Sequence, residues 1–411
     1  MNDISRDRSL LSLENFTEIS SSEVELLLCC ARTCIDLATK KRIELLVKQD
    51  IDWIHLIQIA SYHGVMPLLY QNLKSIRSEA IPENVLARLR FNYQANDLRN
   101  HYLAEELIDI LDKFEAEGIL AVSFKGPLLS ITAYDNLSFR QFSDLDIIVD
   151  KNDFIKAQKI LNNLDFRALN DINFSDSFQE QLYFQEIDEF ALIAHNKSID
   201  IICDLHQAIT VCHFRKCKIE LPKLKDRLTY ITLNKTKIHS IQPDYLLILL
   251  CIHASRHFWS QLNWICDINE LINSHAETNW SKVLDEASLI GCKYHFLLGL
   301  YLSHYYLNTT IPQKIKAEIA ASWRIKYLGK YIVKRMFASL EDMPGQGFNG
   351  SNLAYQILLT NGWQGYREIL EYFILPTSKD KLAFNLPSWL SFLYYFLRPI
   401  RLFSQFVVRE N

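Results

Sequence analysis

The apolar pattern of this chain changes twice along its length, and this change limits the fold more than any other feature. Residues 1–117 and 241–411 carry long stretches with apolar side chains at helical spacing, whereas residues 118–240 contain short runs of β-forming residues. One helical stripe consists of Leu107, Ile110, Leu111 and Phe114. We therefore expect two helical regions on either side of an α/β core.

The composition supports a globular, helix-rich protein. Of 411 residues, 49% are hydrophobic and 12% aromatic, which excludes general disorder. Only 11 Gly and 10 Pro are present, which excludes collagen-like and linker-rich chains. The net charge of −4 argues against a protein dedicated to binding duplex DNA.

The cysteines and apolar runs favour a cytoplasmic protein. Nine cysteines include no pair separated by two residues, and most lie in apolar runs, so we expect reduced core thiols. The first residues, 1–14, are polar and lack the apolar segment of a secretory signal. The longest apolar run, Tyr245–Ile252, is too short to span a membrane.

Four short runs in the central region predict strands of a mixed sheet. A helix-like stretch, 153–163, follows the second run, and Asn196-Lys197 would form a hairpin turn between the last two. The expected strands are 119–124, 145–149, 190–195 and 199–205.

Asp144 and Asp146 flank a single apolar residue in the second of these strands. Side chains alternate along a strand, so both carboxylates share one face while Leu145 and Ile147 point to the other. Two such carboxylates repel each other unless a cation lies between them, and Mg²⁺ prefers one or two carboxylates plus substrate phosphates. The alternative is an exposed edge strand with two solvated aspartates.

The residues upstream of this pair favour phosphate binding. Lys125 and Gly126 lie between the first strand and a helix-like segment, 127–134. Glycine allows close approach of a phosphate, and the helix N-terminus favours negative charge. Arg140 would contact phosphate oxygens with two hydrogen bonds.

A third carboxylate is available in the last strand. Asp200 and Asp204 have the same parity there, and both are candidates; His206 follows on the same face as Asp204. We prefer Asp204, for the reason given by the resemblance below.

These motifs together resemble the uncharacterised nucleotidyltransferase family of the DNA-polymerase-β-like superfamily. The resemblance rests on Lys125-Gly126, on Arg140 with Ser143–Val149, and on Asp204-Leu205-His206. It extends to His253–Trp259 and Trp264–Asp267, and it covers most of the chain, from Trp53–Leu69 to Tyr394–Pro399.

The resemblance implies an α+β fold, with a mixed-sheet polymerase-β-like core flanked by N- and C-terminal helical domains. It implies two Mg²⁺ ions held by the catalytic residues Asp144, Asp146 and Asp204. The nucleotide-binding residues would be Lys125, Gly126, Arg140 and Ser143. One departure is Pro127, because the superfamily usually has Ser after the glycine, and proline offers neither hydroxyl nor backbone donor.

The expected activity is transfer of NMP, as AMP from ATP, to a hydroxyl or phosphate of an unknown acceptor. Tailoring of a natural-product peptide or small molecule is the first hypothesis. The alternatives are an antitoxin-like AMP transferase acting on a protein or tRNA, and a catalytically inactive nucleotide-binding module.

His253 and His257 share one helix face, since they are four residues apart. They would pack at a domain junction, help to form the nucleotide or acceptor pocket with His206, or bind zinc. The residue after His253 is not Glu, so the metalloprotease motif is absent. Asp267 would support these histidines or Arg256, or be a surface carboxylate.

For two C-terminal segments the sequence is compatible either with no partner or with a binding partner. A mostly basic run, 314–335, predicts a solvated helix face, with an anionic acceptor such as RNA or an acidic peptide as the alternative. Trp389–Val408 predicts a helix packed on the body, with Arg398 and Arg401 reaching water; peripheral membrane contact is the alternative.

Overall fold

The computed structural model describes residues 21–338 and 350–408 apart from short gaps. The gaps are 77, 170–183, 185–186, 196–198, 212–217, 378–379, 381–383 and 385. The hairpin turn expected at Asn196-Lys197 therefore lies outside the described residues, as do Cys212 and Cys217. Six of the other cysteines are buried free thiols, as expected, and Cys34 is exposed.

A five-stranded mixed sheet forms the centre of the α/β region. Its strand order is β1-β2-β5-β4-β3, where β2 and β5 are parallel and the other neighbours are antiparallel. The strands are β1 (Ala121–Ser123), β2 (Asp144–Val149), β3 (Arg167–Ala168), β4 (Glu189–Ala194) and β5 (Ile201–His206). The predicted α+β class with a mixed sheet is confirmed.

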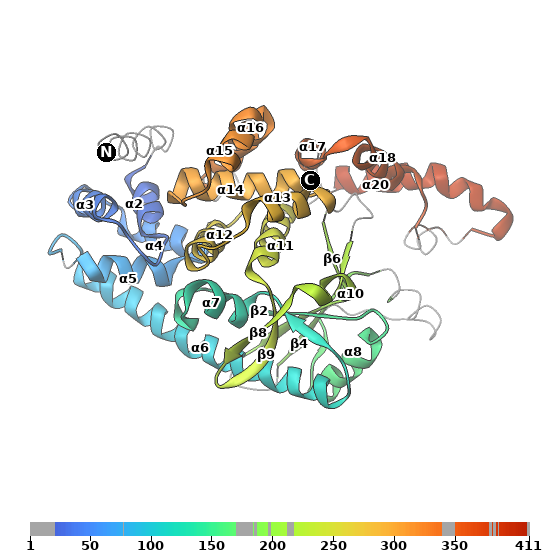
Figure 1. Ribbon diagram of the computed structural model, residues 1–411, viewed down its shortest axis with the longest axis horizontal. Helices are drawn as coiled ribbons and strands as arrows, with labels where there is room; N and C mark the ends of the chain where they lie inside the picture. The colour runs from blue at the N-terminus through green and yellow to red at the C-terminus, as the bar shows by residue number, and fades with distance from the viewer. Residues whose placement is uncertain are drawn as a thin grey trace.

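The alternation along β2 separates a core face from a polar face. Leu145 and Ile147 are fully buried and belong to one apolar cluster with residues of α6 (Glu83–Ala116) and α8 (Phe154–Asn163). The predicted stripe ending at Phe114 is the part of α6 that enters this cluster, and α6 runs along the sheet region in Figure 1. Asp144 and Asp146 consequently point to the opposite face.

The candidate phosphate-binding residues Lys125 and Gly126 lie in the connection from β1 to β2. Helix α7 (Gly126–Tyr134) begins directly after Lys125, with Gly126 in a left-handed conformation at φ 54° and Pro127 in the first turn. Proline suits this position, because the first-turn N–H has no partner within the helix. A short turn, η2 (Leu137–Phe139), then leads into β2.

The described residues also contain two antiparallel pairs of strands outside this sheet. The pairs are β6 (Ala208–Thr210) with β7 (Lys218–Glu220), and β8 (Leu228–Leu233) with β9 (Thr236–Ile241). Short helical turns α10 (Leu221–Leu224) and η3 (Lys225–Arg227) separate them.

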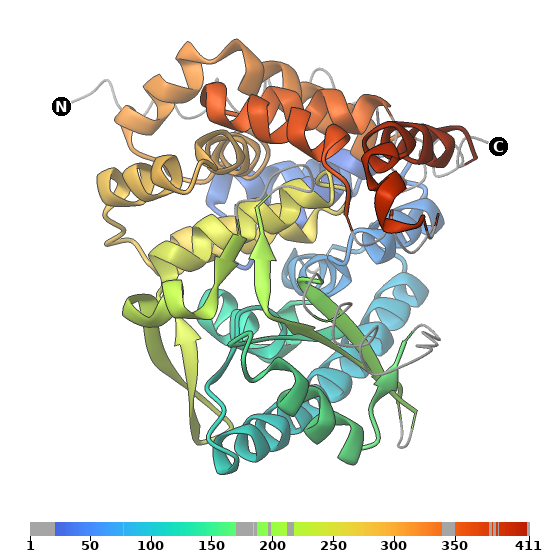
Figure 2. The same ribbon diagram turned by 90° about the vertical axis from the view of Figure 1, so that its right-hand side faces the viewer.

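The N-terminal helices lie beside the C-terminal helices (Figure 2), and buried residues of both belong to one apolar core. Leu26 and Leu69 from the first helices belong to the same buried cluster as Ile248 and Phe296. The first helices are α2 (Ser22–Cys30), α3 (Leu37–Leu46), α4 (Trp53–Tyr62) and α5 (Met66–Ile76). The later ones are α11 (Pro243–Arg256), α12 (Asn263–Ser274), α13 (Trp280–Leu289), α14 (Lys293–Leu307), α15 (Gln313–Ala321) and α16 (Trp323–Met336). The division at residues 117 and 240 stays a prediction about domains.

The last helices are α17 (Gly350–Leu359), α18 (Gly362–Ile374), η5 (Ser388–Leu393) and α20 (Tyr394–Val408). Arg398 is buried and does not reach water as expected, whereas Arg401 is half-buried. They bind the two oxygens of buried Asp380, at 2.6 and 2.7 Å. A buried carboxylate attracts both guanidinium groups inward, whereas Trp389 and Phe396 are exposed. No helix among the described residues has the length and apolarity required to cross the bilayer.

The basic run 314–335 occupies α15 and α16. Its lysines Lys314, Lys326 and Lys334 are exposed, which agrees with the predicted solvated face.

Candidate active site

Two aspartates face each other across the parallel strands β2 and β5. Asp146 on β2 lies directly beside Asp204 on β5. Asp144 is two residues before Asp146, so its side chain points to the same face of the sheet. Asp146 is buried, whereas Asp144 and Asp204 are half-buried. Asp200 precedes β5 and pairs with His195 at 2.9 Å, where both side chains are exposed. Of the two candidates for the third carboxylate, only Asp204 faces the pair.

Lys125 supplies a buried positive charge at this carboxylate group. Its Nζ lies 2.6 Å from Oδ1 of Asp146 and 3.3 Å from Nδ1 of His253. Burial raises the pKa of Asp146, but the Lys125 charge and a hydrogen bond from His206 outweigh it and hold that pKa below its usual range. Asp146 is therefore ionised at neutral pH.

The other two carboxylates resist ionisation. Burial, and next the charge of Asp146, raise the pKa of Asp144. The pKa of Asp204 rises to about 7 through burial, then through Asp146, Glu189 and Asp144. The carboxyl groups of Asp144, Asp146 and Asp204 therefore lie close together. The positive charge beside them is too small to balance three ionised carboxylates.

One pocket of about 360 Å³ collects most of the residues that the sequence singled out. Those lining it are Lys125, Arg140, Ser143, Asp144, Asp146, Asp204, His206, His253 and His257. Gly126 is not in the lining but supports it, since a Cβ there would lie 3.3 Å from the carbonyl oxygen of Asp144. Asp267 is not in the lining either.

His206 links the carboxylates to a residue that sequence reasoning missed. Its Nε2 lies 3.1 Å from Oδ1 of Asp146, and its Nδ1 lies 3.6 Å from Oε2 of Glu189. Arg256 approaches the same Glu189 oxygen at 3.8 Å. Glu189 begins β4 opposite His206, so only the strand register would have pointed to it.

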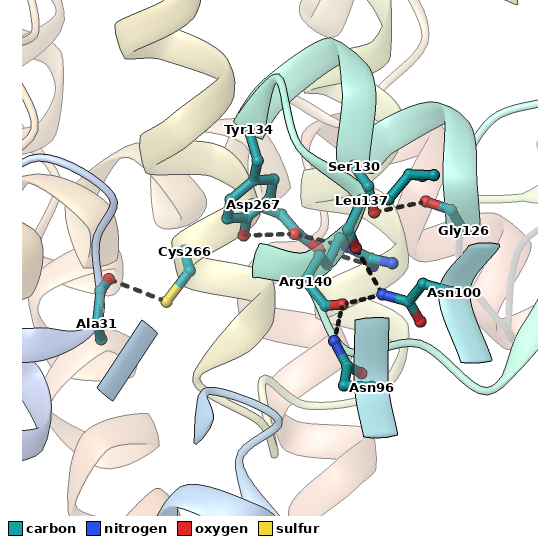
Figure 3. A network of polar contacts seen from close by, with 10 residues as sticks. All are labelled: Ala31, Asn96, Asn100, Gly126, Ser130, Tyr134, Leu137, Arg140, Cys266 and Asp267. Carbon is teal, nitrogen blue, oxygen red and sulfur yellow. Dashed lines mark hydrogen bonds and ion pairs between the residues drawn. The ribbon is translucent and has the colours of Figure 1, made fainter. Parts of the chain in front are cut away.

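Asp267 binds the guanidinium group of Arg140 (Figure 3). It accepts hydrogen bonds from Nε and Nη2 of Arg140, at 2.8 and 2.9 Å, and from the hydroxyl of Tyr134 at 2.8 Å. Asp267 is buried, so the hypothesis of a surface carboxylate is wrong. Its hydrogen bonds go to Arg140 and Tyr134 rather than to the histidines or Arg256 of the other hypothesis. Nη1 of Arg140 is buried and has no hydrogen-bond partner among the described residues. Arg140 and Lys125 both line the pocket.

The carbonyl of Arg140 is fixed as well. Asn100 and Asn96 of α6 donate to it at 2.8 and 3.2 Å, as Figure 3 shows. Both ends of this arginine are therefore held by neighbouring helices. The sequence pattern does not predict this role for the two asparagines, because a polar amide on a helix is usually expected to face solvent.

Three aromatic side chains, His253, His257 and Trp264, form one wall of the pocket. The rings of His253 and His257 lie 4.7 Å apart, and each lies within 5.6 Å of the Trp264 ring. Burial, followed by the charges of Lys125 and His257, lowers the pKa of His253 well below its usual value. Both histidines therefore line the pocket rather than serving as packing alone. Further polar residues there, absent from the sequence expectations, are Ser61, Asn96, Arg99, Gln261 and Asn263.

The carboxylates fit a divalent cation in their donor chemistry. Oδ2 of Asp146 is buried and has no hydrogen-bond partner among the described residues. As they stand, no three His, Cys, Asp or Glu side chains of those residues are grouped closely enough to hold a metal ion. Mg²⁺ does not require such a cage, because one or two carboxylates and substrate phosphates complete its shell.

Comparison with known proteins gives one family match. A family profile described as "Uncharacterised nucleotidyltransferase" matches residues 49–308. The match includes every pocket residue named above, whereas the C-terminal segment Tyr394–Pro399 lies beyond it. No curated protein and no solved structure matches the chain.

Proposed function

The chain belongs to the uncharacterised nucleotidyltransferase family, and on this premise we propose that it is a Mg²⁺-dependent enzyme that transfers NMP from a nucleoside triphosphate. The donor is ATP and the transferred group AMP. The observation that carries this proposal is the register of Asp146 opposite Asp204 on adjacent parallel strands, with Asp144 on the same face.

The strand arrangement supports a polymerase-β-like core. The mixed sheet β1-β2-β5-β4-β3 presents the first two carboxylates on one strand and the third on its parallel neighbour. The helices on either side of this sheet would then be the flanking domains. Under this proposal Asp144, Asp146 and Asp204 hold the divalent cation, which when bound supplies charge neutralisation for the triphosphate and the leaving pyrophosphate.

The cationic side of the pocket suits the triphosphate. Lys125 and Arg140 both line it, and the N-terminus of α7 follows Lys125. Asp267 accepts one hydrogen bond each from Nε and Nη2 of Arg140, which leaves the N–H groups of Nη1 for a phosphate. Ser143 is exposed in the lining and offers a hydroxyl to the same phosphates.

Asp204 suits the role of general base towards the acceptor. It is half-buried in the pocket, and therefore accessible to an acceptor hydroxyl or phosphate. The attacking group would lose its proton to Asp204 as it bonds to the α-phosphorus and pyrophosphate leaves.

The acceptor is proposed to be a peptide or small molecule. The lining also includes the aromatic wall and the amides of Gln261 and Asn263, uncharged groups that would suit such an acceptor. A cytoplasmic location agrees with the buried free thiols.

The proposal is tested by measuring pyrophosphate release from each of the four nucleoside triphosphates with Mg²⁺. The same reactions, run with α-labelled nucleotide over pools of metabolites, peptides and RNA, identify the acceptor. Release with ATP that stops on addition of a chelator is expected. Binding of ATP without any release in the presence of all three pools would indicate a nucleotide-binding module instead.

A further inference from the structure

Helix α16 carries two exposed rows of side chains outside the pocket. One row is aromatic, and its members are Trp323, Tyr327 and Tyr331. The other row is basic, and its members are Lys326, Lys330 and Lys334. The residues of each row are four positions apart, so both rows run along the helix with the same repeat of about 6 Å. None of these six residues lines the pocket of the carboxylates.

The opposite face of α16 is buried, which turns both rows outward. Ile325, Leu328 and Ile332 belong to the core shared by the N-terminal and C-terminal helices, and α16 lies on the far side of α14 from the sheet (Figure 1). In the aromatic row, Trp323 is 64% exposed and Tyr327 is 57% exposed. Large rings exposed in one row, rather than scattered singly, are typical of an interaction site.

The surface around α16 is strongly basic, although the whole chain has a net charge of −4. Residues 313–336 contain seven Lys or Arg and one Glu. That acidic residue, Glu318, pairs with Lys293 of α14 at 2.9 Å. It therefore does not neutralise the lysines of α16, and this surface attracts anions.

We propose that α16 is a binding surface for single-stranded RNA, whose bases stack on the aromatic row while its phosphates contact the lysine row. Each nucleotide of a single strand offers a flat ring and one negative charge, and the two parallel rows complement this pair of groups. Lipid surfaces and acidic peptides carry charge, but neither carries a flat ring at every charged unit. RNA is the single strand expected in the cytoplasm, a location with which the buried free thiols agree.

This surface goes beyond the proposed nucleotidyl transfer and does not depend on it, because it lies outside the pocket. Substitutions on α16 should therefore leave pyrophosphate release from ATP at the wild-type level. Failure of one proposal leaves the other standing.

The aromatic row is tested by fluorescence anisotropy, with full-length protein and a labelled oligouridylate of about 12 nucleotides. Trp323→Ala combined with Tyr327→Ala should weaken binding by about tenfold or more, because two bases lose their stacking partners. The matched control is Trp363→Ala, which removes an 83% exposed tryptophan of α18 and should leave the affinity unchanged.

The lysine row is tested by the salt dependence of the same binding. Each phosphate contact to a single strand contributes about 0.7 to the steepness of log affinity against log salt concentration, so Lys326→Gln with Lys334→Gln should reduce the steepness by about 1.4. Lys41→Gln with Lys48→Gln removes the same charge from exposed positions of the N-terminal helices and should leave it unchanged. The aromatic double variant should keep the wild-type steepness.

Trp323→Phe separates stacking from charge, because phenylalanine keeps a ring but lacks indole fluorescence. It should bind like the wild type and lose the quenching of protein fluorescence that the oligonucleotide causes. If the aromatic double variant does not fold, as judged by circular dichroism, this loss of quenching decides.

A wild type that does not bind the oligonucleotide would overturn the proposal, and so would wild-type affinity in the folded aromatic double variant. Displacement of the oligonucleotide by polyglutamate, or by phosphatidylserine vesicles, at equal charge concentration would assign the surface to an acidic peptide or to a membrane instead.

Discussion

Asp200 and Asp204 differ in role because of their neighbours, although they occupy equivalent positions in the sequence pattern. Asp200 pairs with His195 in solvent, whereas Asp204 lies opposite Asp146 inside the pocket. Alternation along a strand predicts the face on which a side chain lies. It does not predict which residues of the neighbouring strand lie beside that side chain. The sequence alone therefore leaves both aspartates as candidates for the third carboxylate. The register of β2 and β5 places only Asp204 beside Asp146.

Asp204→Asn should reduce turnover by about 100-fold or more, in line with loss of a positioned base. The affinity for ATP should stay within a few-fold of wild type, because Lys125, Arg140 and the other two cation ligands, Asp144 and Asp146, still hold the phosphates. Pyrophosphate release and calorimetry measure the two quantities. Asp200→Asn is the matched control and should leave both unchanged. A dead Asp200→Asn together with an active Asp204→Asn would contradict this assignment.

Gly126 and Gly118 form a second matched pair, since both have positive φ, 54° and 74°. Replacing either by Ala should cost about 1 kcal/mol of stability, because a Cβ disfavours this backbone region. A Cβ at Gly126 also presses on the carbonyl of Asp144, at 3.3 Å, whereas at Gly118 no atom lies within 4 Å. Only Gly126→Ala should therefore lower turnover, as measured by pyrophosphate release. Equal turnover in the two folded variants would show that Gly126 does not support the site.

At the scale of elements, the pair Arg140–Asp267 joins the β1–β2 connection to α12. The two hydrogen bonds between them are buried, and Tyr134 of α7 adds a third to the same carboxylate. Such a junction fixes an arginine that also borders the pocket. Through this junction α12, a helix of the C-terminal region, fixes the position of a residue in the β1–β2 connection of the sheet.

Asp267→Asn should lower the free energy of unfolding by about 3–5 kcal/mol, because the buried guanidinium of Arg140 loses its counter-charge. Tyr134→Phe removes only one hydrogen bond to a charged group and should cost about 1.5–3 kcal/mol. Urea unfolding of both variants measures these costs. A loss below about 1 kcal/mol for Asp267→Asn would mean that the pair contributes little to the junction.

The elements themselves were largely predictable from the sequence. The expected strands 145–149 and 190–195 correspond to β2 and β4, and the stretch 153–163 corresponds to α8, because local alternation and periodicity specify them. What the sequence left undetermined depends on contacts between distant elements. Glu189 and Asn100 enter the site through strand register and helix packing, which no local pattern contains.

For the whole molecule, His63 joins the N-terminal and C-terminal helices. It is buried at the end of α4, accepts a hydrogen bond from the backbone N–H of Leu262 at 3.4 Å, and packs on the Phe337 ring. Its carbonyl accepts from the N–H of Asn263. The pattern change that suggested separate helical regions could not reveal this shared core, since it reports local structure alone.

Burial lowers the pKa of His63 from 6.5 to about 4, so this histidine is neutral in the folded protein. Below pH 6.5 only the unfolded chain binds the proton, and stability should fall by about 1.4 kcal/mol per pH unit until about pH 4. Urea unfolding at about pH 7.5 and about pH 5.5 measures the loss. His63→Gln should lose correspondingly less between these two pH values. An identical loss in the variant and the wild type would contradict this.

The central claim is that Asp144 and Asp146 carry metal-dependent nucleotidyl transfer, and Asp146→Asn tests it most directly. The substitution keeps the shape of the side chain and removes the charge that Lys125 and the cation share. Pyrophosphate release from ATP is measured at saturating Mg²⁺, with the circular dichroism spectrum as the check on folding and Asp200→Asn as the control. The account predicts that Asp146→Asn is folded and inactive while Asp200→Asn matches the wild type. Turnover at the wild-type rate by Asp146→Asn would contradict it.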